Sequence, residues 1–191
     1  LQEEQHALLS SLHREGDDMT IRDLCLSLLC DRLQLEVPFD LPLSELVALL
    51  DRPLRVCGMV PNSGEPGGGP FWVRDAAGRL TRQIVEGAQI DKADPNQLAI
   101  LQQATYFNPV DLVCGVRDWR GQPYDLSGYV DHDAVLVTEK SQEGEAIRVL
   151  ELPGLWNGAM AHWHTLFVEI PEAAFNPVKT LFDLLRPAHQ G

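Results

Sequence analysis

The chain has 191 residues, of which 45% are hydrophobic, and its formal net charge is −13. This size and composition are enough to bury the core of one domain, or of a large part of one. Binding to a nucleic-acid backbone needs clustered Lys and Arg, so the acidic balance argues against nucleic acid as a partner. No apolar run reaches the ~20 residues that cross a bilayer, and we expect no membrane partner.

Cysteine usage and the start of the chain indicate its setting. The four cysteines, at positions 25, 30, 57 and 114, include no Cys-x-x-Cys pair and are too few for a secreted disulfide scaffold. We therefore expect a reducing, cytoplasmic location. Leu1 begins directly in an amphipathic helical pattern, with no methionine before it, so we expect the chain to be part of a longer protein.

Helical spacing of apolar residues characterises residues 1–53, which we treat as a helical segment. The expected helices cover residues 3–14, 20–35 and 43–50. Asp18 and Thr20 are candidates to cap the second helix, because their side-chain oxygens can accept hydrogen bonds from free backbone N–H groups of the first turn.

The pattern changes at Leu54, after which short apolar runs typical of strands alternate with helical spacing. The expected strands are residues 54–60, 70–74, 80–86, 104–107, 135–139, 146–150 and 166–170. The expected helices are residues 96–103, 109–118 and 155–163, with one more indicated by Leu181, Leu184 and Leu185. This alternation predicts an α/β fold for residues 54–191, with a mixed sheet flanked by helices.

Lys179 is one of only three lysines and follows a turn that proline would hold. Pro177 fixes its own φ and biases Asn176 toward an extended conformation, so Lys179 is expected where a strand passes into a helix. An ammonium there, beside the partial positive charge of a helix N-terminus, can bind phosphate. The alternative is an ordinary strand-to-helix junction with a solvated lysine.

A glycine-rich loop, residues 64–70, separates two expected strands. Its three adjacent glycines would allow a sugar ring or a diphosphate to approach the backbone closely. The loop lacks the Gly-Lys-Ser/Thr ending of a P-loop and does not open a helix, so it fits neither common nucleotide-binding loop. The alternative is a flexible hairpin loop without a ligand.

Two polar side chains lie at the ends of expected strands. Glu86 ends one strand and Asn108 follows another. If these strands are neighbours, a carboxylate and an amide meet at their carboxyl ends, where open α/β sheets bind ligands, and the pair suits sugar hydroxyls. The alternative for Asn108 is to cap a helix that begins at Pro109.

Other groups contain ligand types without a convincing arrangement. The runs 131–133 and 162–164 hold histidine and aspartate, but alternating histidines would diverge and no third ligand follows from the spacing. We expect no metal site at either.

Six short motifs follow one another between residues 54 and 186. They are Gly68-Gly69, Glu86-Gly87-Ala88-Gln89-Ile90, Phe107-Asn108, Lys140 with Gly144, Leu150-Glu151, and Phe175-Asn176-Pro177-Val178-Lys179-Thr180 with Asp183-Leu184-Leu185. In order and rough spacing they resemble motifs of UDP-glucose pyrophosphorylases and related UDP-sugar pyrophosphorylases. The resemblance implies the C-terminal half of a nucleotide-diphospho-sugar-transferase-like (GT-A-like) domain.

The resemblance also implies roles for five residues. In the pyrophosphorylases the matching lysine contacts nucleotide and sugar phosphates, which implies a catalytic role for Lys179. The matching glycines, glutamate and asparagine imply substrate binding, in particular of the sugar, by Gly68, Gly69, Glu86 and Asn108.

The chain departs from the pyrophosphorylase pattern in three ways. Gly67 stands where the relatives have lysine, so a phosphate contact there is not implied. Val110 and Asp111 replace two asparagines, which leaves the sugar and the base open. The N-terminal glycine-rich loop that holds the triphosphate is absent. We therefore expect the nucleotide, and any Mg²⁺, to be bound by a missing N-terminal half, and this chain alone to be inactive.

Longer phrases give a closer resemblance. Residues 55–73, 103–115, 150–163 and 175–190 resemble an uncharacterised bacterial family, domain-of-unknown-function family 4301. Together the two resemblances favour part of a sugar-phosphate nucleotidyltransferase, with a sugar phosphate or sugar nucleotide as partner. The alternatives are a non-catalytic sugar-nucleotide binding or regulatory protein on the same fold, and a purely structural partner domain.

Overall fold

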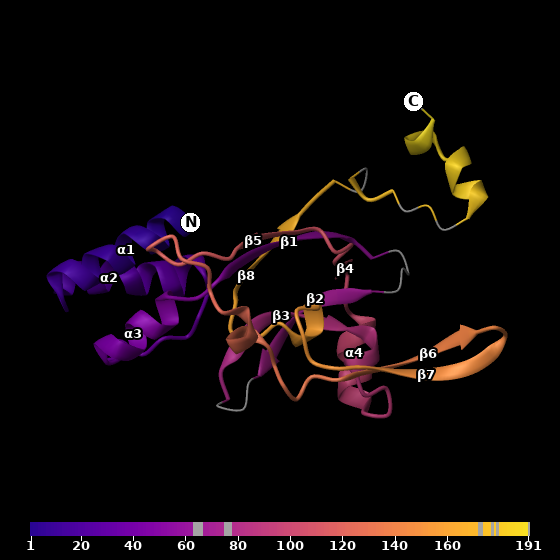
Figure 1. Cartoon of the computed structure of the whole chain (residues 1–191), viewed down its shortest axis with the longest axis horizontal. Helices are drawn as coiled ribbons and strands as arrows, with labels where there is room; N and C mark the ends of the chain where they lie inside the picture. Colours follow the sequence, from indigo (N-terminus) through magenta and orange to yellow (C-terminus); the bar gives the residue numbers. More distant parts are fainter. Residues whose placement is uncertain (63–66, 75–77, 172–173, 177, 179, 191) are drawn as a thin grey trace.

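A computed structural model describes residues 1–62, 67–74, 78–171, 174–176, 178 and 180–190. Figure 1 shows helices gathered at the N-terminal end, strands in the middle, and two projections, a hairpin and the C-terminal segment. Lys179 and Pro177 lie outside the described residues, so the expected phosphate-binding turn stays a prediction.

The N-terminal helices form the main hydrophobic core. They are α1 (Gln2–Glu15), α2 (Met19–Ser27), which continues as a π-helix (Leu28–Arg32), and α3 (Leu43–Leu50). Their apolar faces bury Leu9, Cys25, Leu29, Leu46 and Leu50. Removing such side chains from water is the main stabilising contribution here.

Of the two capping candidates for α2, Asp18 is the N-cap and Thr20 lies inside the helix, which is shorter than expected. The Asp18 carboxylate accepts hydrogen bonds from the backbone N–H groups of Thr20 and Ile21. At its other end, helical structure stops at Arg32 and Gln34 takes a φ of 55°, which an α-helix cannot accommodate. The expected helix over 20–35 therefore ends early.

β1 (Leu54–Pro61) is the central strand of a mixed four-stranded sheet. β8 (His164–Glu169) pairs with it in parallel and β5 (Leu112–Gly115) antiparallel. Because both use residues 54–57 of β1, they lie on opposite edges. The short strand β4 (Tyr106–Phe107) pairs antiparallel with Val60 and Pro61.

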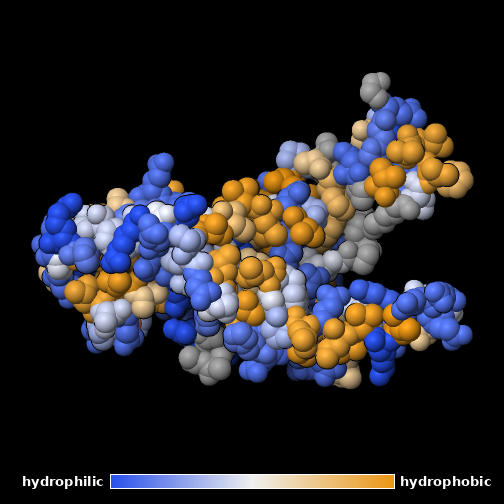
Figure 2. Space-filling model, viewed as in Figure 1, coloured by the Kyte–Doolittle hydropathy of each residue, from blue (hydrophilic) through white to orange (hydrophobic). Residues whose placement is uncertain are grey.

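Two antiparallel hairpins complete the strands. β2 (Gly68–Arg74) pairs with β3 (Leu80–Glu86), and β6 (Leu136–Gln142) pairs with β7 (Glu145–Glu151). The second turn has positive φ at both Glu143 (54°) and Gly144 (88°), the combination that suits the twist of a two-residue hairpin. This hairpin projects from the body of the molecule, and apolar side chains cover part of its surface (Figures 1 and 2).

The arrangement is mixed α/β, as expected, but its helices do not flank the sheet evenly. α1, α2 and α3 cluster at one end, and α4 (Pro95–Gln102) lies near the hairpins (Figure 1). The N-terminal cluster contacts the sheet through Leu54 and Leu166, and the turn that follows β5 through Trp119. A smaller cluster of Cys57, Met59 and Ile84 joins β1 to the β2–β3 hairpin.

Two predicted helices are wrong. Residues 109–118 contain β5, because Leu112–Gly115 pairs with β1 instead of coiling. Residues 155–163 hold only a 3-10 turn, Asn157–Ala159, and His162 takes a φ of 62° that ends helical structure. The helix expected after Thr180 is a 3-10 helix, Leu181–Leu185, with a capping box between Thr180 and Asp183.

Candidate functional site

The β2–β3 hairpin and β4 bring the four described site residues into one neighbourhood. Gly68 and Glu86 are direct partners across the hairpin, and Gly69 follows on β2. The backbone N–H of Asn108 donates a hydrogen bond to the carbonyl of Gly68 at 2.8 Å. Two segments that are 40 residues apart in sequence therefore meet at Gly68. The strands that precede Glu86 and Asn108 are not paired with each other, however, because β3 pairs with β2 and β4 pairs with β1.

Gly68 is a glycine because of its neighbours. A Cβ at this position would lie 2.6 Å from Ile84 Cγ2 and 2.9 Å from Glu86 Oε1. At Gly69 a Cβ would lie 3.0 Å from Phe71 Cε2 and 3.3 Å from the carbonyl of Tyr106. Neither glycine has positive φ among the described backbone, so close approach, not an unusual turn, explains them.

Glu86 is half-buried and held by a reciprocal capping pair. Its carboxylate accepts from the backbone N–H of Gln89, while Gln89 Oε1 accepts from the backbone N–H of Glu86 at 2.9 Å. Burial raises the pKa of Glu86 above its ordinary value, and the nearby charge of Glu151 adds to the rise. The same Gln89 donates through Nε2 to the carbonyl of Gly158 at 2.9 Å, which ties the hairpin to the 157–159 turn.

The Asn108 side chain is buried and engaged with protein groups. Its Nδ2 donates to the carbonyl of Gly58 at 2.7 Å, and its Oδ1 accepts from Val110 N and Asn157 Nδ2, both at 3.0 Å. The bond to Val110 closes a turn, as the capping alternative anticipates, but it leads into β5 and not into a helix. Both Oδ1 lone pairs are used by these bonds, so a sugar contact by this amide would have to use the second Nδ2 hydrogen.

A cavity of about 470 Å³ adjoins the hairpin. Gly69 and Glu86 line it, together with Lys92, Phe107 and Thr138. Gly68 and Asn108 are not among its lining residues, so they support the wall without forming it. The Thr138 hydroxyl is buried without a hydrogen-bond partner, a state that a ligand at this wall would relieve.

Two residues of this cavity were missed by the sequence analysis. Lys92 is one of the three lysines, and this scarcity was its only signal. Thr138 lies in an ordinary strand pattern, so nothing in the sequence singles it out. Phe175 of the lysine-bearing motif packs against Phe107 with ring centroids 5.1 Å apart, which brings the start of that motif to the cavity.

The predictions about metal sites and membrane spans concern residues outside this cavity. Among the described residues, no group of three or more His, Cys, Asp or Glu side chains is placed to hold a metal ion. No described helix is both long and apolar enough to cross a membrane.

The free cysteines include the buried Cys25 and Cys57, and burial raises the pKa of both thiols to about 11.

The fold and site thus define a mixed α/β protein with a small cavity beside a glycine-bearing hairpin. Over residues 1–190 the sequence matches the family described as Domain of unknown function (DUF4301), and the chain belongs to this family. Among curated proteins no match is found.

Among solved structures, the chain is similar to UDP-glucose pyrophosphorylase from Leishmania major. A mutant of that enzyme in complex with UDP-Glc shares 19% identity with a TM-score of 0.42, covering 80% of this chain and 34% of that one. Its open and closed structures give 20% identity and a TM-score of 0.39, covering 75% of this chain and 32% of that one. The chain spans about a third of the length of these structures.

Proposed function

We propose that the chain is the sugar- and phosphate-binding part of a sugar-phosphate nucleotidyltransferase. The observation that carries the proposal is the position of Glu86: a half-buried carboxylate faces Gly68, which has no side chain, beside a cavity of about 470 Å³. A carboxylate accepts hydrogen bonds from sugar hydroxyls, and glycine backbone permits a ring to lie against it. The order of the motifs supports the same assignment.

In this proposal each residue has a distinct role. Glu86 binds sugar hydroxyls, and Gly69 forms the wall on which the sugar rests. Gly68 keeps the Glu86 carboxylate in place, and Asn108 holds Gly68 through its backbone. Lys179 neutralises charge on the transferring phosphates, where positioning and electrostatic stabilisation are the main contributions of the protein.

The reaction would be attack of a sugar phosphate on the α-phosphate of a nucleoside triphosphate, with pyrophosphate leaving. Nucleotide and Mg²⁺ would be bound by residues that precede Leu1 in a longer protein. Accordingly, this chain alone should release no pyrophosphate from nucleoside triphosphates and sugar 1-phosphates.

The second candidate function is non-catalytic sugar-nucleotide binding or regulation. Gly67 favours it, because this residue lines the cavity where the pyrophosphorylase motif has lysine. A protein that lost a phosphate contact there could retain the sugar pocket without turnover. The absence of turnover in the longest natural form of the protein, together with sugar-nucleotide binding, would favour this candidate.

Calorimetric titration with a panel of sugar 1-phosphates and sugar nucleotides tests the site itself. We expect at least one to bind, and Glu86→Gln to weaken binding by about tenfold or more, since hydrogen bonds to a charged group contribute ~1.5–3 kcal/mol. Glu145→Gln, on the exposed β6–β7 hairpin, is the matched charge control. Equal affinity of wild type and Glu86→Gln for every ligand that binds would exclude this cavity as the sugar site.

A further inference from the structure

A second and larger cleft, of about 990 Å³, has no place in the proposed function. Three parts of the chain bound it: α3 and the residues before it, the β2–β3 hairpin, and segments 130–133 and 158–165. Its volume lies at the upper end of the ~300–1,000 Å³ typical of small-molecule sites. Apart from Val85, the residues that line it differ from those that line the Glu86 cavity.

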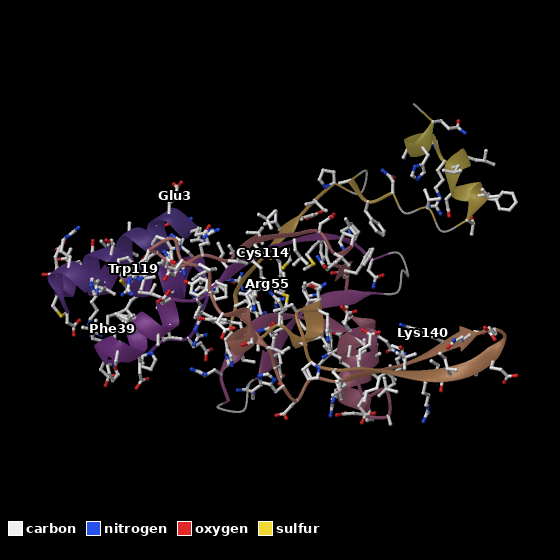
Figure 3. All side chains as sticks on the ribbon, viewed as in Figure 1. Glu3, Phe39, Arg55, Cys114, Trp119 and Lys140 are labelled. Carbon is white, nitrogen blue, oxygen red and sulfur yellow. The ribbon has the colours of Figure 1, made fainter. Side chains whose placement is uncertain are left out.

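A buried arginine lies behind the wall of this cleft. Arg55 is fully buried in the centre of the molecule (Figure 3). Its Nε donates to Thr165 Oγ1 at 2.9 Å and its Nη2 to Gln83 Oε1 at 2.6 Å, and both partners line the cleft. The third acceptor is the Asn157 carbonyl, at 3.5 Å.

All three acceptors of Arg55 are uncharged. Among the described residues no carboxylate forms an ion pair with it. A buried cation without a counter-ion is costly, and in a low-dielectric wall its field reaches the cleft with little screening.

His164 adds an unsatisfied polar group to the same wall. It is 3% exposed, lines the cleft, and its Nε2 is buried without a hydrogen-bond partner. Burial is the main cause that lowers the pKa of His164 to about 4, and the charge of Arg52 adds to it. The imidazole is therefore neutral at neutral pH. Its ring donates to backbone carbonyls of Leu49 and Leu50, and Nε2, which has no partner, is the acceptor nitrogen.

Positive charge dominates the inner part of the cleft. Its exposed residues carry both signs: Glu36, Glu45, Asp131, Asp133, Arg74 and Arg79. Only two charged lining residues of the cleft are not exposed, and both are arginines, Arg52 and Arg82. Arg82 donates through Nη2 to the carbonyl of Leu33 and forms no ion pair with a described residue.

We propose that this cleft binds a small anionic molecule, whose phosphate or carboxylate group accepts hydrogen bonds from Arg82 and whose hydroxyl group donates to His164 Nε2. Arg55 supplies positive charge from behind and holds Gln83 and Thr165 in place. The exposed residues of both signs then contact the less charged remainder of the ligand. The site goes beyond the proposed function, since none of these residues contacts the Glu86 carboxylate in the described structure.

Titration of the protein with inorganic phosphate and, separately, with citrate tests the proposal at constant ionic strength. We expect one of them to bind saturably in calorimetry and to shift the imidazole resonances of His164. Arg82→Gln should weaken that binding by about tenfold or more, because a charge-assisted hydrogen bond is lost. Preference for phosphate would indicate a phosphorylated ligand, and preference for citrate a carboxylated one.

Three further variants make the result decisive. Arg82→Lys keeps the charge and should retain most of the affinity. Arg148→Gln removes a positive charge from the exposed β6–β7 hairpin and should leave this binding unaltered. If thermal melts show that Arg82→Gln is unfolded, His164→Gln replaces it. Failure of both anions to bind, equal affinity in the cleft variants and wild type, or an equal loss in Arg148→Gln would each overturn the proposal.

Discussion

Gly68 and Glu86 face each other across the β2–β3 hairpin so closely that a Cβ on Gly68 would lie 2.9 Å from Glu86 Oε1. The missing side chain at one position therefore fixes where the carboxylate at the other can lie. Any side chain at position 68 changes both the packing on Ile84 and the direction of the Glu86 carboxylate. This makes position 68 a sensitive probe of the candidate sugar site.

Gly68→Ala should lower the free energy of unfolding by about 1–3 kcal/mol, as expected when a methyl group is forced into a packed site. It should also weaken binding of any ligand that contacts Glu86. Gly128→Ala is the control, because a Cβ there would meet nothing within 4 Å. Denaturant unfolding and ligand titration of both variants give the comparison. A Gly68→Ala protein as stable as Gly128→Ala would contradict the close packing.

Asn108→Asp separates a structural role of this residue from a sugar-binding one. A carboxylate cannot donate to the Gly58 carbonyl, which now accepts from Asn108 Nδ2 at 2.7 Å. We expect a loss of about 2–3 kcal/mol in the free energy of unfolding, since a buried acceptor is left unpaired and a charge is introduced. The loss should appear in urea unfolding without any ligand. Unchanged stability combined with lost sugar binding would instead favour direct contact.

Local pattern predicts the strands and helices that need no distant partner. The expected helix over 43–50 and strand over 80–86 have the bounds of α3 and β3. Residues 109–118 were mispredicted because their apolar spacing also suits a helix, whereas β1, some 55 residues earlier in sequence, provides the strand partner. The Asn108 turn, with Val110 at a φ of 70°, directs the chain into that pairing.

Like the secondary structure, the candidate site could be predicted from the sequence only in part. Motif order indicates Gly68, Gly69, Glu86 and Asn108, of which only Gly69 and Glu86 line the cavity. The engagement of the Asn108 amide with Asn157 depends on a turn 49 residues away, which no local pattern encodes. Likewise, Arg55 reads as an ordinary strand residue, since its partners lie 28, 102 and 110 residues away in sequence.

Arg55→Ala should be among the most destabilising single changes in this protein. It leaves Gln83 Oε1 and Thr165 Oγ1 without their donor and opens a cavity, so we expect a loss of about 3 kcal/mol or more in the free energy of unfolding. Arg55→Lys should rescue only part of it, because an ammonium lacks the planar fork of donors. Arg148→Ala, at an exposed position, is the control. Chemical denaturation that gives Arg55→Ala and Arg148→Ala equal stabilities would contradict a structural role for Arg55.

Lys179→Ala tests the catalytic assignment in the longest natural form of the protein. Loss of one preorganised electrostatic donor should lower kcat by about two orders of magnitude, or ~3 kcal/mol. Lys179→Arg should restore activity only partly, because a planar guanidinium does not replace a compact ammonium. Steady-state kinetics, with thermal melts as the folding control, measure both variants. An unimpaired Lys179→Ala enzyme would remove the main residue-level support for the nucleotidyltransferase proposal.

His164 should make the protein less stable as the pH falls from about 6.5 to 4. Its pKa is lowered to about 4 in the folded state, against 6.5 when solvated. Above pH 6.5 both states are neutral and His164 adds no pH dependence. Below it, the unfolded state takes up a proton that the folded state does not, so the free energy of unfolding falls by ~1.4 kcal/mol per pH unit, about 3 kcal/mol in all.

Replacing this imidazole isolates its share of the pH dependence. His164→Gln cannot titrate, whereas the carboxylates that also respond to acid are common to both proteins. Subtracting the two profiles of unfolding free energy, measured in urea between pH 4 and 8, should leave a slope confined to the range from 6.5 to 4. Parallel profiles would mean that His164 is protonated as readily in the folded protein as in the unfolded chain. The wall of the larger cleft would then be open to water, contrary to the burial of its Nε2.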